Sequence, residues 1–434
     1  MPATAVSEIE RAPREQLAAL QLERLRTLVA CLLDAVAPVR ERLHAAGVRS
    51  ADEVASLDDL RGLPFATKGD LREHYPFGLL AVPREEVARV HASSGTSGKP
   101  TVVGYTRRDL EMWTEVMARS LATAGMRPGM VAHNANGYGL FTGGLGFHDG
   151  AERLGATVIP VSGGNTERQL LLLRDLRGQA LFATPSYALR LGHALRDAGG
   201  GPDDLALEVG VFGGEPWTAA LGREIERHLG LAAVNMYGLS EIVGPGVAVE
   251  CIEERNGLHV NEDHFLVEVV DPETGTPLPE RVEGELVFST LTKEALPMLR
   301  YRTGDVASLD AAPCACGRTF ARISPVRGRI DDMLIIRGIN LYPSEIEHTL
   351  LGVPGVAPHY QIVVERPTDL DVLTVHCEPS EDGIDRVQLR ERVAHALRDR
   401  TGLSIAVELL ESGAVPRSEG KAVRVVDRRR GSAP

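Results

Sequence analysis

The sequence has 434 residues, more than one hydrophobic core usually organises, so two or three packed units are expected. Hydrophobic residues make up 43% and charged residues 25%, the balance of a soluble globular protein. The formal net charge of −13 argues against nucleic acid or an anionic membrane as the main partner, so an anionic substrate would need a local positive site.

The chain carries no pattern typical of export or membrane insertion. The apolar stretch Leu28–Val39 is interrupted by Asp34 and flanked by Arg26 and Arg40, which predicts an amphipathic helix. Met1–Arg14 lacks the apolar core of a secretory signal, and five cysteines are too few and too scattered for a disulfide framework. The expected location is the cytoplasm, with neither a membrane nor a nucleic acid as partner.

The elements are predicted in chain order from apolar spacing. Residues 8–48 are rich in Leu, Ala, Arg and Glu at helical spacing, so we expect a mainly helical segment over residues 1–85. From about residue 88, short apolar runs alternate with helical stretches, which predicts β-sheets covered by helices. The runs predicted as strands are 102–105, 156–160, 181–184, 209–212, 265–270 and 284–289.

A domain boundary is expected near residues 326–331, because the pattern restarts there with the apolar run 333–336. The elements predicted beyond it are helix 343–352, strands 359–365 and 371–377, helix 385–400 and strand 404–410. We therefore predict an α/β protein with a large N-terminal domain, residues 1–328, and a small C-terminal α+β domain, residues 329–434.

Residues 93–100 read Ser-Ser-Gly-Thr-Ser-Gly-Lys-Pro, a hydroxyl-rich loop with one lysine. Its glycines would let the backbone approach phosphate oxygens, and its hydroxyls and lysine would donate to them. The alternative is a solvent-exposed hairpin turn. The loop is not a Walker A motif, because Gly-x-x-x-x-Gly-Lys-Ser/Thr is absent. The predicted phosphate contacts are Ser93, Ser94, Gly95, Thr96, Ser97, Gly98 and Lys99.

Four further motifs follow this loop. They are Tyr-Gly-Leu-Ser-Glu at 237–241, Tyr-Arg-Thr-Gly-Asp at 301–305, Gly-Arg-Ile-Asp-Asp at 328–332 and Pro-Arg-Ser-Glu-Gly-Lys at 416–421. Each motif alone is weak. In this order the five resemble the adenylate-forming enzymes, which activate carboxylates with ATP. The resemblance is strongest to the phenylacetate–CoA ligase family and covers nearly the whole chain.

The resemblance implies roles for single residues. Glu241 would hold Mg²⁺, because a hard cation prefers carboxylate oxygen, and Asp305 would accept hydrogen bonds from both ribose hydroxyls. Lys421 would bridge the substrate carboxylate and the α-phosphate during adenylation. Arg329 would contact ribose and phosphate, and Asp331 would be the hinge of a mobile C-terminal domain.

Plainer interpretations exist for three of these motifs. Ser240 followed by an acid is ordinary helix-capping chemistry, Asp305 could lie in a surface turn, and Lys421 could be a solvated side chain. The segment Gly213–Pro216 matches the family segment that packs along adenine, and Tyr237 would lie near adenine and the acyl group. The other predicted nucleotide contacts are Gly214, Glu215, Pro216, Tyr237, Gly238 and Ser240.

We expect the acid to bind along residues 138–146, where two aromatic side chains accompany a glycine run. Aromatic faces stack on a flat ring and glycines leave a slot, which favours an aryl acid. A glycine-rich loop with core aromatics is the alternative. Asn261 stands where the family usually has Trp, a weak indication of a hydroxy- or amino-substituted ring. The predicted substrate contacts are Tyr138, Phe141, Gly143, Gly144, Gly214 and Tyr237.

Four residues form a second constellation: Cys251, His259, Cys314 and Cys316. Three thiolates and one imidazole suit tetrahedral Zn²⁺, and four protein ligands leave no open position, so the metal would be structural. Their proximity is implied by the resemblance, since some relatives carry cysteines at matching places. Unrelated buried thiols are the alternative.

The function implied by the resemblance is an ATP- and Mg²⁺-dependent ligase. It would convert an aryl acid to an acyl adenylate and pass the acyl group to coenzyme A. The hypotheses kept beside it are transfer to a carrier-protein thiol, activation of nitrite in place of a carboxylate, and a nucleotide sensor without catalysis. A homodimer is also left open.

Overall fold

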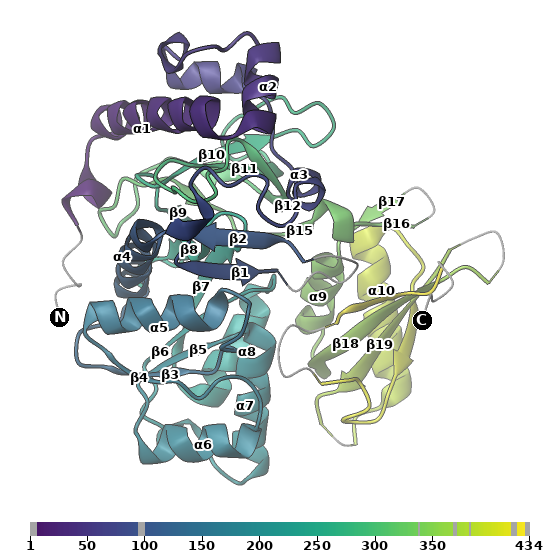
Figure 1. Cartoon of the computed structure of the whole chain (residues 1–434). Helices are drawn as coiled ribbons and strands as arrows, with labels where there is room; N and C mark the ends of the chain where they lie inside the picture. The colour runs from purple at the N-terminus through teal and green to yellow at the C-terminus, as the bar shows by residue number, and fades with distance from the viewer. Residues whose placement is uncertain are drawn as a thin grey trace. The chain divides into compact units, whose positions relative to one another are not determined.

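The computed structural model describes residues 7–93, 100–336, 339–367, 371–381, 383–417 and 423–429. Helices alternate with strands along the chain, so the predicted α/β class is confirmed (Figure 1). The chain divides into two compact units. The first comprises residues 1–183, 205–214 and 231–325, and the second comprises residues 184–204, 215–230 and 326–434.

The first unit begins with helices, but the helix predicted through residues 28–39 is broken. Helix α1 spans Arg14–Ala35 and α2 spans Ala37–Ala45, and Val36 between them leaves helical geometry at φ −116° and ψ 89°. Pro38 lacks the N–H that a continuous helix would donate four residues back, so the helix restarts with proline in its first turn. The prediction of one helix was therefore wrong at this point.

A nine-stranded sheet forms the centre of the first unit, in the order β13-β14-β9-β8-β7-β6-β5-β3-β4. Strands β4, β3, β5, β6 and β7 are parallel, and the remaining pairs are antiparallel. The parallel strand β5 is buried along its whole length, as expected for a strand covered on both faces. The bounds are β3 Val131–Asn134, β4 Thr157–Ile159, β5 Ala180–Ala183, β6 Val209–Gly213, β7 Ala232–Leu239, β8 Gly244–Glu250, β9 Leu258–Val260, β13 Leu309–Asp310 and β14 Arg322–Ile323.

Two smaller groups of antiparallel strands complete the first unit. Strand β11 pairs with both β10 and β12, and β1 pairs with β2 as a hairpin. Helix α4 packs against α5 and β8. The bounds are β1 Arg89–Ala92, β2 Val102–Tyr105, β10 Phe265–Val270, β11 Gly284–Thr290, β12 Tyr301–Ala307, α3 Lys68–Glu73, α4 Arg107–Thr123, α5 Gly143–Leu154 and α6 Thr166–Asp175.

The second unit contains helices α7 and α8 and a small α+β assembly. Its sheet has the order β20-β19-β18-β21, and its buried side chains form one core between this sheet and helices α9 and α10. The bounds are α7 Pro185–Asp197, α8 Ala219–Leu229, β15 Gly328–Arg329, β16 Leu334–Ile336, β17 Ile339–Leu341, α9 Pro343–Gly352, β18 Val356–Glu365, β19 Val372–Pro379, α10 Arg386–Thr401, β20 Ala406–Leu409 and β21 Val425–Asp427.

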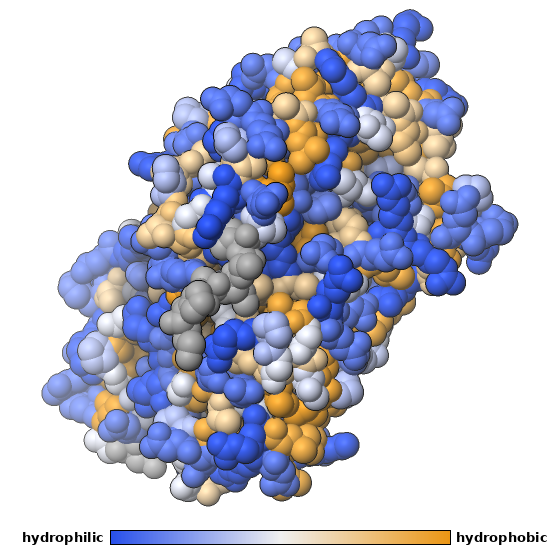
Figure 2. All heavy atoms as spheres, turned by 90° about the vertical axis from the view of Figure 1, so that its left-hand side faces the viewer, coloured by the Kyte–Doolittle hydropathy of each residue, from blue (hydrophilic) through white to orange (hydrophobic). Residues whose placement is uncertain are grey.

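The helices of the described residues are too short or too polar to cross a membrane. On the face drawn in Figure 2, hydrophobic residues gather in small groups among hydrophilic ones.

A buried arginine ties the N-terminal segment to the β10–β12 strands. Arg300 is 2% exposed, and its guanidinium donates to both carboxylate oxygens of Glu268 at 3.0 and 2.9 Å. It also donates to the carbonyls of Arg61 at 2.9 Å and Leu63 at 2.7 Å, and lies 4.0 Å from the ring centroid of Phe65. One side chain thus satisfies polar groups from two distant parts of the sequence.

We predict that Arg300→Met destabilises the first unit by about 3–5 kcal/mol, because it leaves the Glu268 carboxylate buried without its partner. Thermal unfolding should show the loss as a lower midpoint. The double variant Glu268→Leu/Arg300→Met should recover much of it, because the stranded charge is removed. A double variant no more stable than Arg300→Met would contradict this account.

Candidate functional site

The motif at 237–241 occupies the end of β7 and the turn that leads into β8. Ser240 and Glu241 are 2% and 7% exposed, and residues 240–243 form a turn between two strands. The helix-capping interpretation of Ser240 was therefore wrong. Its hydroxyl instead lies 3.3 Å from the hydroxyl of Thr142, the residue before α5.

Glu241 has the chemistry of a ligand for a hard cation. Within the described residues, its carboxylate accepts no hydrogen bond, although the side chain is almost fully buried. A carboxylate with unused lone pairs suits Mg²⁺, which prefers oxygen ligands. The residue present at this position therefore fits the metal that the motif implies.

A hydrogen bond joins the 237–241 and 301–305 motifs. The hydroxyl of Tyr237, on β7, donates to Oδ2 of Asp305, on β12, over 2.6 Å. The Tyr237 ring also stacks on Phe288 of β11 at a centroid distance of 5.9 Å. Asp305 is 8% exposed within a strand, so the surface-turn interpretation was wrong. Two predicted nucleotide contacts from different sheets are thus brought side by side.

The predicted phosphate loop connects β1 to β2 in the sequence, and these two strands pair as a hairpin. The amide of Ser93 donates to the Thr101 carbonyl at 3.0 Å, and the amide of Thr101 donates to the Ser93 hydroxyl at 3.4 Å. Residues 94–99, which carry the remaining predicted phosphate contacts, lie outside the described residues. The hairpin therefore fixes the two ends of the loop.

The predicted acid-binding segment begins after β3 and runs into α5. The hydroxyl of Tyr138 accepts from the Asn134 amide at 2.7 Å and lies 3.0 Å from Nδ1 of His148, while burial raises the pKa of Tyr138 to about 12. Phe141 is 36% exposed. A Cβ on Gly144 would lie 2.4 Å from the Gly137 carbonyl oxygen, so this glycine allows close backbone packing and opens no slot.

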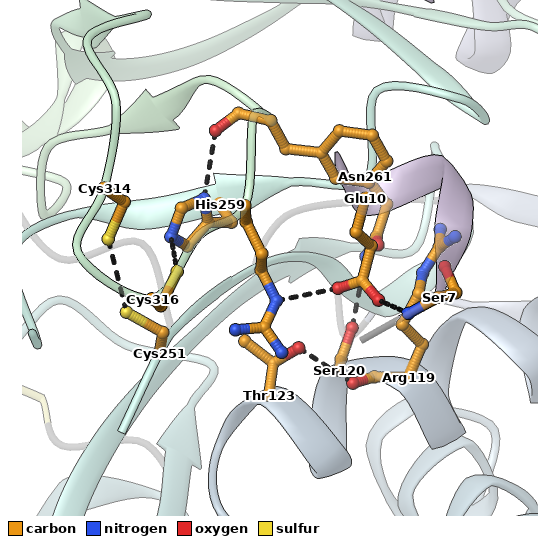
Figure 3. A network of polar contacts seen from close by, with 12 residues as sticks. Ser7, Glu10, Arg119, Ser120, Thr123, Cys251, His259, Asn261, Cys314 and Cys316 are labelled. Carbon is orange, nitrogen blue, oxygen red and sulfur yellow. Dashed lines mark hydrogen bonds and ion pairs between the residues drawn. The ribbon is translucent and has the colours of Figure 1, made fainter. Parts of the chain in front are cut away.

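Asn261 serves internal packing. Its amide nitrogen donates to the Ser120 hydroxyl at 3.1 Å and to the Gly246 carbonyl at 2.7 Å, and the residue is 4% exposed (Figure 3). Because both N–H donors are used inside the protein, the interpretation of Asn261 as a reader of ring substituents loses its basis.

The four predicted zinc ligands meet in space (Figure 3). Their donor atoms all lie within 4.8 Å of one another. The Sγ atoms of Cys251 and Cys314 are 3.7 Å apart, and Sγ of Cys316 is 3.4 Å from Nε2 of His259. A tetrahedral zinc with Zn–S of about 2.3 Å and Zn–N of about 2.0 Å requires S···S of about 3.8 Å and S···N of about 3.5 Å. The spacing of this donor set therefore fits zinc.

The surroundings of the cluster set the tautomer of His259 and shift the pKa values of the thiols. Nδ1 of His259 lies 3.0 Å from the Phe320 carbonyl, to which it donates, so Nε2 is left as an acceptor toward Cys316. The hydrogen bond with Cys251 lowers the pKa of Cys316 far below the usual value of a thiol, while burial raises the pKa of Cys314.

The remaining predicted residues belong mainly to the second unit. Gly214 has φ +84° and closes a segment of the first unit, and Oε1 of Glu215 accepts from the Ser186 amide at 2.7 Å within the second. Arg329 ends β15, and Asp331 lies in the 3-10 turn Ile330–Asp332 that follows. Lys421 lies outside the described residues.

Sequence patterns missed the side chains that hold the turn after β7. Tyr105, Trp113 and Lys293 each donate to a backbone carbonyl of this turn or of the start of β8. Lysine is rare in this chain, with four residues against 43 arginines, and this rarity was the one available signal.

Comparisons with known proteins agree with this geometry. A family described as AMP-binding enzyme matches residues 10–292, and one described as AMP-binding enzyme C-terminal domain matches residues 338–429. The chain is 55% identical to a phenylacetate-coenzyme A ligase of Thermus thermophilus, covering 98% of this chain and 99% of the relative. It is 49% identical to a phenylacetate-coenzyme A ligase of Escherichia coli, covering 98% of both.

A solved structure extends the likeness to three dimensions. The crystal structure of a 2-hydroxyisobutyryl-CoA ligase in the postadenylation state matches with a TM-score of 0.93 and 29% identity, covering 99% of this chain and 94% of the other. The chain belongs to the AMP-binding enzyme family and, within it, to the phenylacetate–coenzyme A ligase family of AMP-forming acid–thiol ligases.

Proposed function

We propose that the chain activates an aryl carboxylic acid, phenylacetate first among the candidates, as an acyl adenylate and passes the acyl group to coenzyme A. The observation that carries this proposal is the hydrogen bond from Tyr237 to Asp305. Tyr237 stands four positions before Glu241, whose carboxylate accepts no hydrogen bond within the described residues. The hydrogen bond joins a ribose acceptor to the turn that carries a metal ligand. The substrate class follows from relatives named phenylacetate-coenzyme A ligase at 55% and 49% identity.

In the first step, a carboxylate oxygen of the acid attacks the α-phosphorus of ATP, and the bond to pyrophosphate breaks. Asp305 orients the ribose, and the loop 93–99 binds the phosphates. The role proposed for Lys421 is to bridge the carboxylate and the α-phosphate, so that its ammonium offsets the charge that develops on phosphorus. Mg²⁺, held by Glu241, supplies charge neutralisation on the phosphates when bound.

In the second step, the thiol of coenzyme A gives its proton to solvent and attacks the acyl carbon, and the bond to AMP breaks. We propose that residues 329–434 turn as a domain about Asp331 against residues 1–328 between the two steps, which withdraws Lys421. Arg329 contacts the ribose and the phosphate of the nucleotide in this proposal. The small domain would thus adopt one arrangement for adenylation and another for thioester formation.

Coenzyme A is the proposed acceptor, since whole-chain relatives are named coenzyme A ligases. A carrier-protein thiol or nitrite would appear as an alternative product in the same assay. A homodimer stays a prediction that sedimentation would test.

A panel of acids tests the substrate class. Pyrophosphate exchange should be fastest with phenylacetate or a close aryl acid, and mass spectrometry with coenzyme A present should find the aryl thioester. Tyr138→Ala should weaken aryl-acid binding by about 1–3 kcal/mol through lost burial, with little change for ATP. Tyr138→Phe, which keeps the ring, is the matched control. Faster exchange with acetate or butyrate than with every aryl acid would refute the proposed class.

Lys421→Ala should separate the two half-reactions. Adenylate formation should fall by several kcal/mol in activation free energy, while thioester formation from preformed adenylate stays nearly intact, because the lysine acts only in the first step. Arg398→Ala, an exposed change on α10, serves as the control. Equal losses in both half-reactions would count against alternation.

We further propose that Cys251, His259, Cys314 and Cys316 hold a structural Zn²⁺. Elemental analysis should find roughly one zinc per chain, given four closed ligands. Cys314→Ser should release the metal and lower the thermal midpoint more than it changes ATP affinity. Cys31→Ser, on α1, should do neither. A full zinc content in Cys314→Ser would remove this residue from the site.

A further inference from the structure

Lys293 is a buried lysine in a chain that otherwise relies on arginine. It is 4% exposed and lies in the segment between β11 and β12. Burying an ammonium costs several kcal/mol unless partners compensate it. The free-energy cost of burying this ammonium indicates that Lys293 has a specific structural role.

The contacts of Lys293 converge on the turn that carries Glu241. Its Nζ donates to the carbonyl of Ile242, the residue directly after Glu241, over 2.8 Å. The ammonium also lies 4.8 Å from the ring centroid of Tyr105, a cation–π contact. Burial lowers the pKa of Lys293 to about 8, and the charges of Asp109 and Glu241 oppose that shift.

Two other side chains anchor the backbone of the same turn. The hydroxyl of Tyr105 donates to the Val243 carbonyl at 2.9 Å, and Nε1 of Trp113 donates to the Pro245 carbonyl at 2.9 Å. The two rings stack at a centroid distance of 5.4 Å. Among these three donors, Lys293 is the one that carries a charge. It holds the residue after Glu241 at 2.8 Å, while the Tyr105 hydroxyl also lies 3.5 Å from the carbonyl of Ser240, the residue before Glu241.

The segment of Lys293 is itself fixed. Asp109 is fully buried, and its carboxylate accepts from the amides of Glu294 at 2.6 Å and Ala295 at 2.9 Å, as well as from the amide of Thr106 at 2.9 Å. The ammonium therefore projects from an immobilised backbone. The carboxylates of both Asp109 and Glu241 attract this ammonium.

We propose that Lys293 is a positioning residue for the magnesium site: its bond to the Ile242 carbonyl fixes the turn that presents the Glu241 carboxylate. This inference rests on the proposed role of Glu241. Groups that orient a metal ligand typically change metal affinity by about 10–100-fold. The removal of this hydrogen bond should therefore weaken Mg²⁺ binding.

The test is Lys293→Met, which keeps an unbranched side chain of similar length and removes the donor. Calorimetry with α,β-methylene-ATP measures binding without turnover, as a function of Mg²⁺ concentration. We expect the Mg²⁺ concentration for half-maximal binding to rise about tenfold or more. Binding of the analogue without Mg²⁺ should change little. An unchanged or tighter Mg²⁺ dependence would overturn the proposal.

Three further variants keep the test decisive. Glu241→Gln should abolish the Mg²⁺ dependence of analogue binding. If the dependence persists, the assignment of Glu241 as a metal ligand fails. If it is abolished while Lys293→Met keeps the Mg²⁺ dependence of the wild type, only the inference about Lys293 fails. Lys293→Gln keeps N–H donors on a shorter side chain and should lie between wild type and Met, which decides the matter if Met does not fold. Arg153→Met, an exposed loss of one charge on α5, should behave as wild type.

Discussion

The site depends on the turn between β7 and β8, whose carbonyls must find donors away from water. Side chains from β2, α4 and the segment before β12 supply them, through Tyr105, Trp113 and Lys293. A buried carbonyl without a donor costs more than a hydrogen bond gains, so these contacts specify one backbone conformation. That backbone conformation determines where Glu241 and Tyr237 lie.

Strand pairing connects this turn to the antiparallel half of the large sheet. β8 pairs with β7 and β9, and the cysteine–histidine cluster closes the far end through His259 on β9 and Cys251 just after β8. In the other direction, Tyr237 reaches Asp305 and so connects this sheet to β12. The predicted nucleotide contacts Tyr237, Glu241 and Asp305 thus belong to one connected framework within the first unit.

The sequence predicted well what depends on local pattern. Apolar runs located the strands at 265–270 and 284–289, and spacing located helix α9 at residues 343–352. It failed where tertiary contacts decide: Val36 breaks the first long helix, and β21, only three residues long, exists through its parallel pairing with β18. The same holds for the site, since motif residues can be read from sequence, whereas Lys293 gains its meaning only from the carbonyl it meets.

Isotope transfer shows directly whether a carboxylate oxygen of the acid attacks the α-phosphorus of ATP. Phenylacetate labelled with ¹⁸O in both carboxylate positions is converted with ATP and coenzyme A, and the nucleotide product is analysed by mass spectrometry. We expect AMP that carries one ¹⁸O, with unlabelled pyrophosphate. Unlabelled AMP, or ADP accompanied by labelled phosphate, would contradict it, since either would mean that the acid was never joined to the α-phosphate.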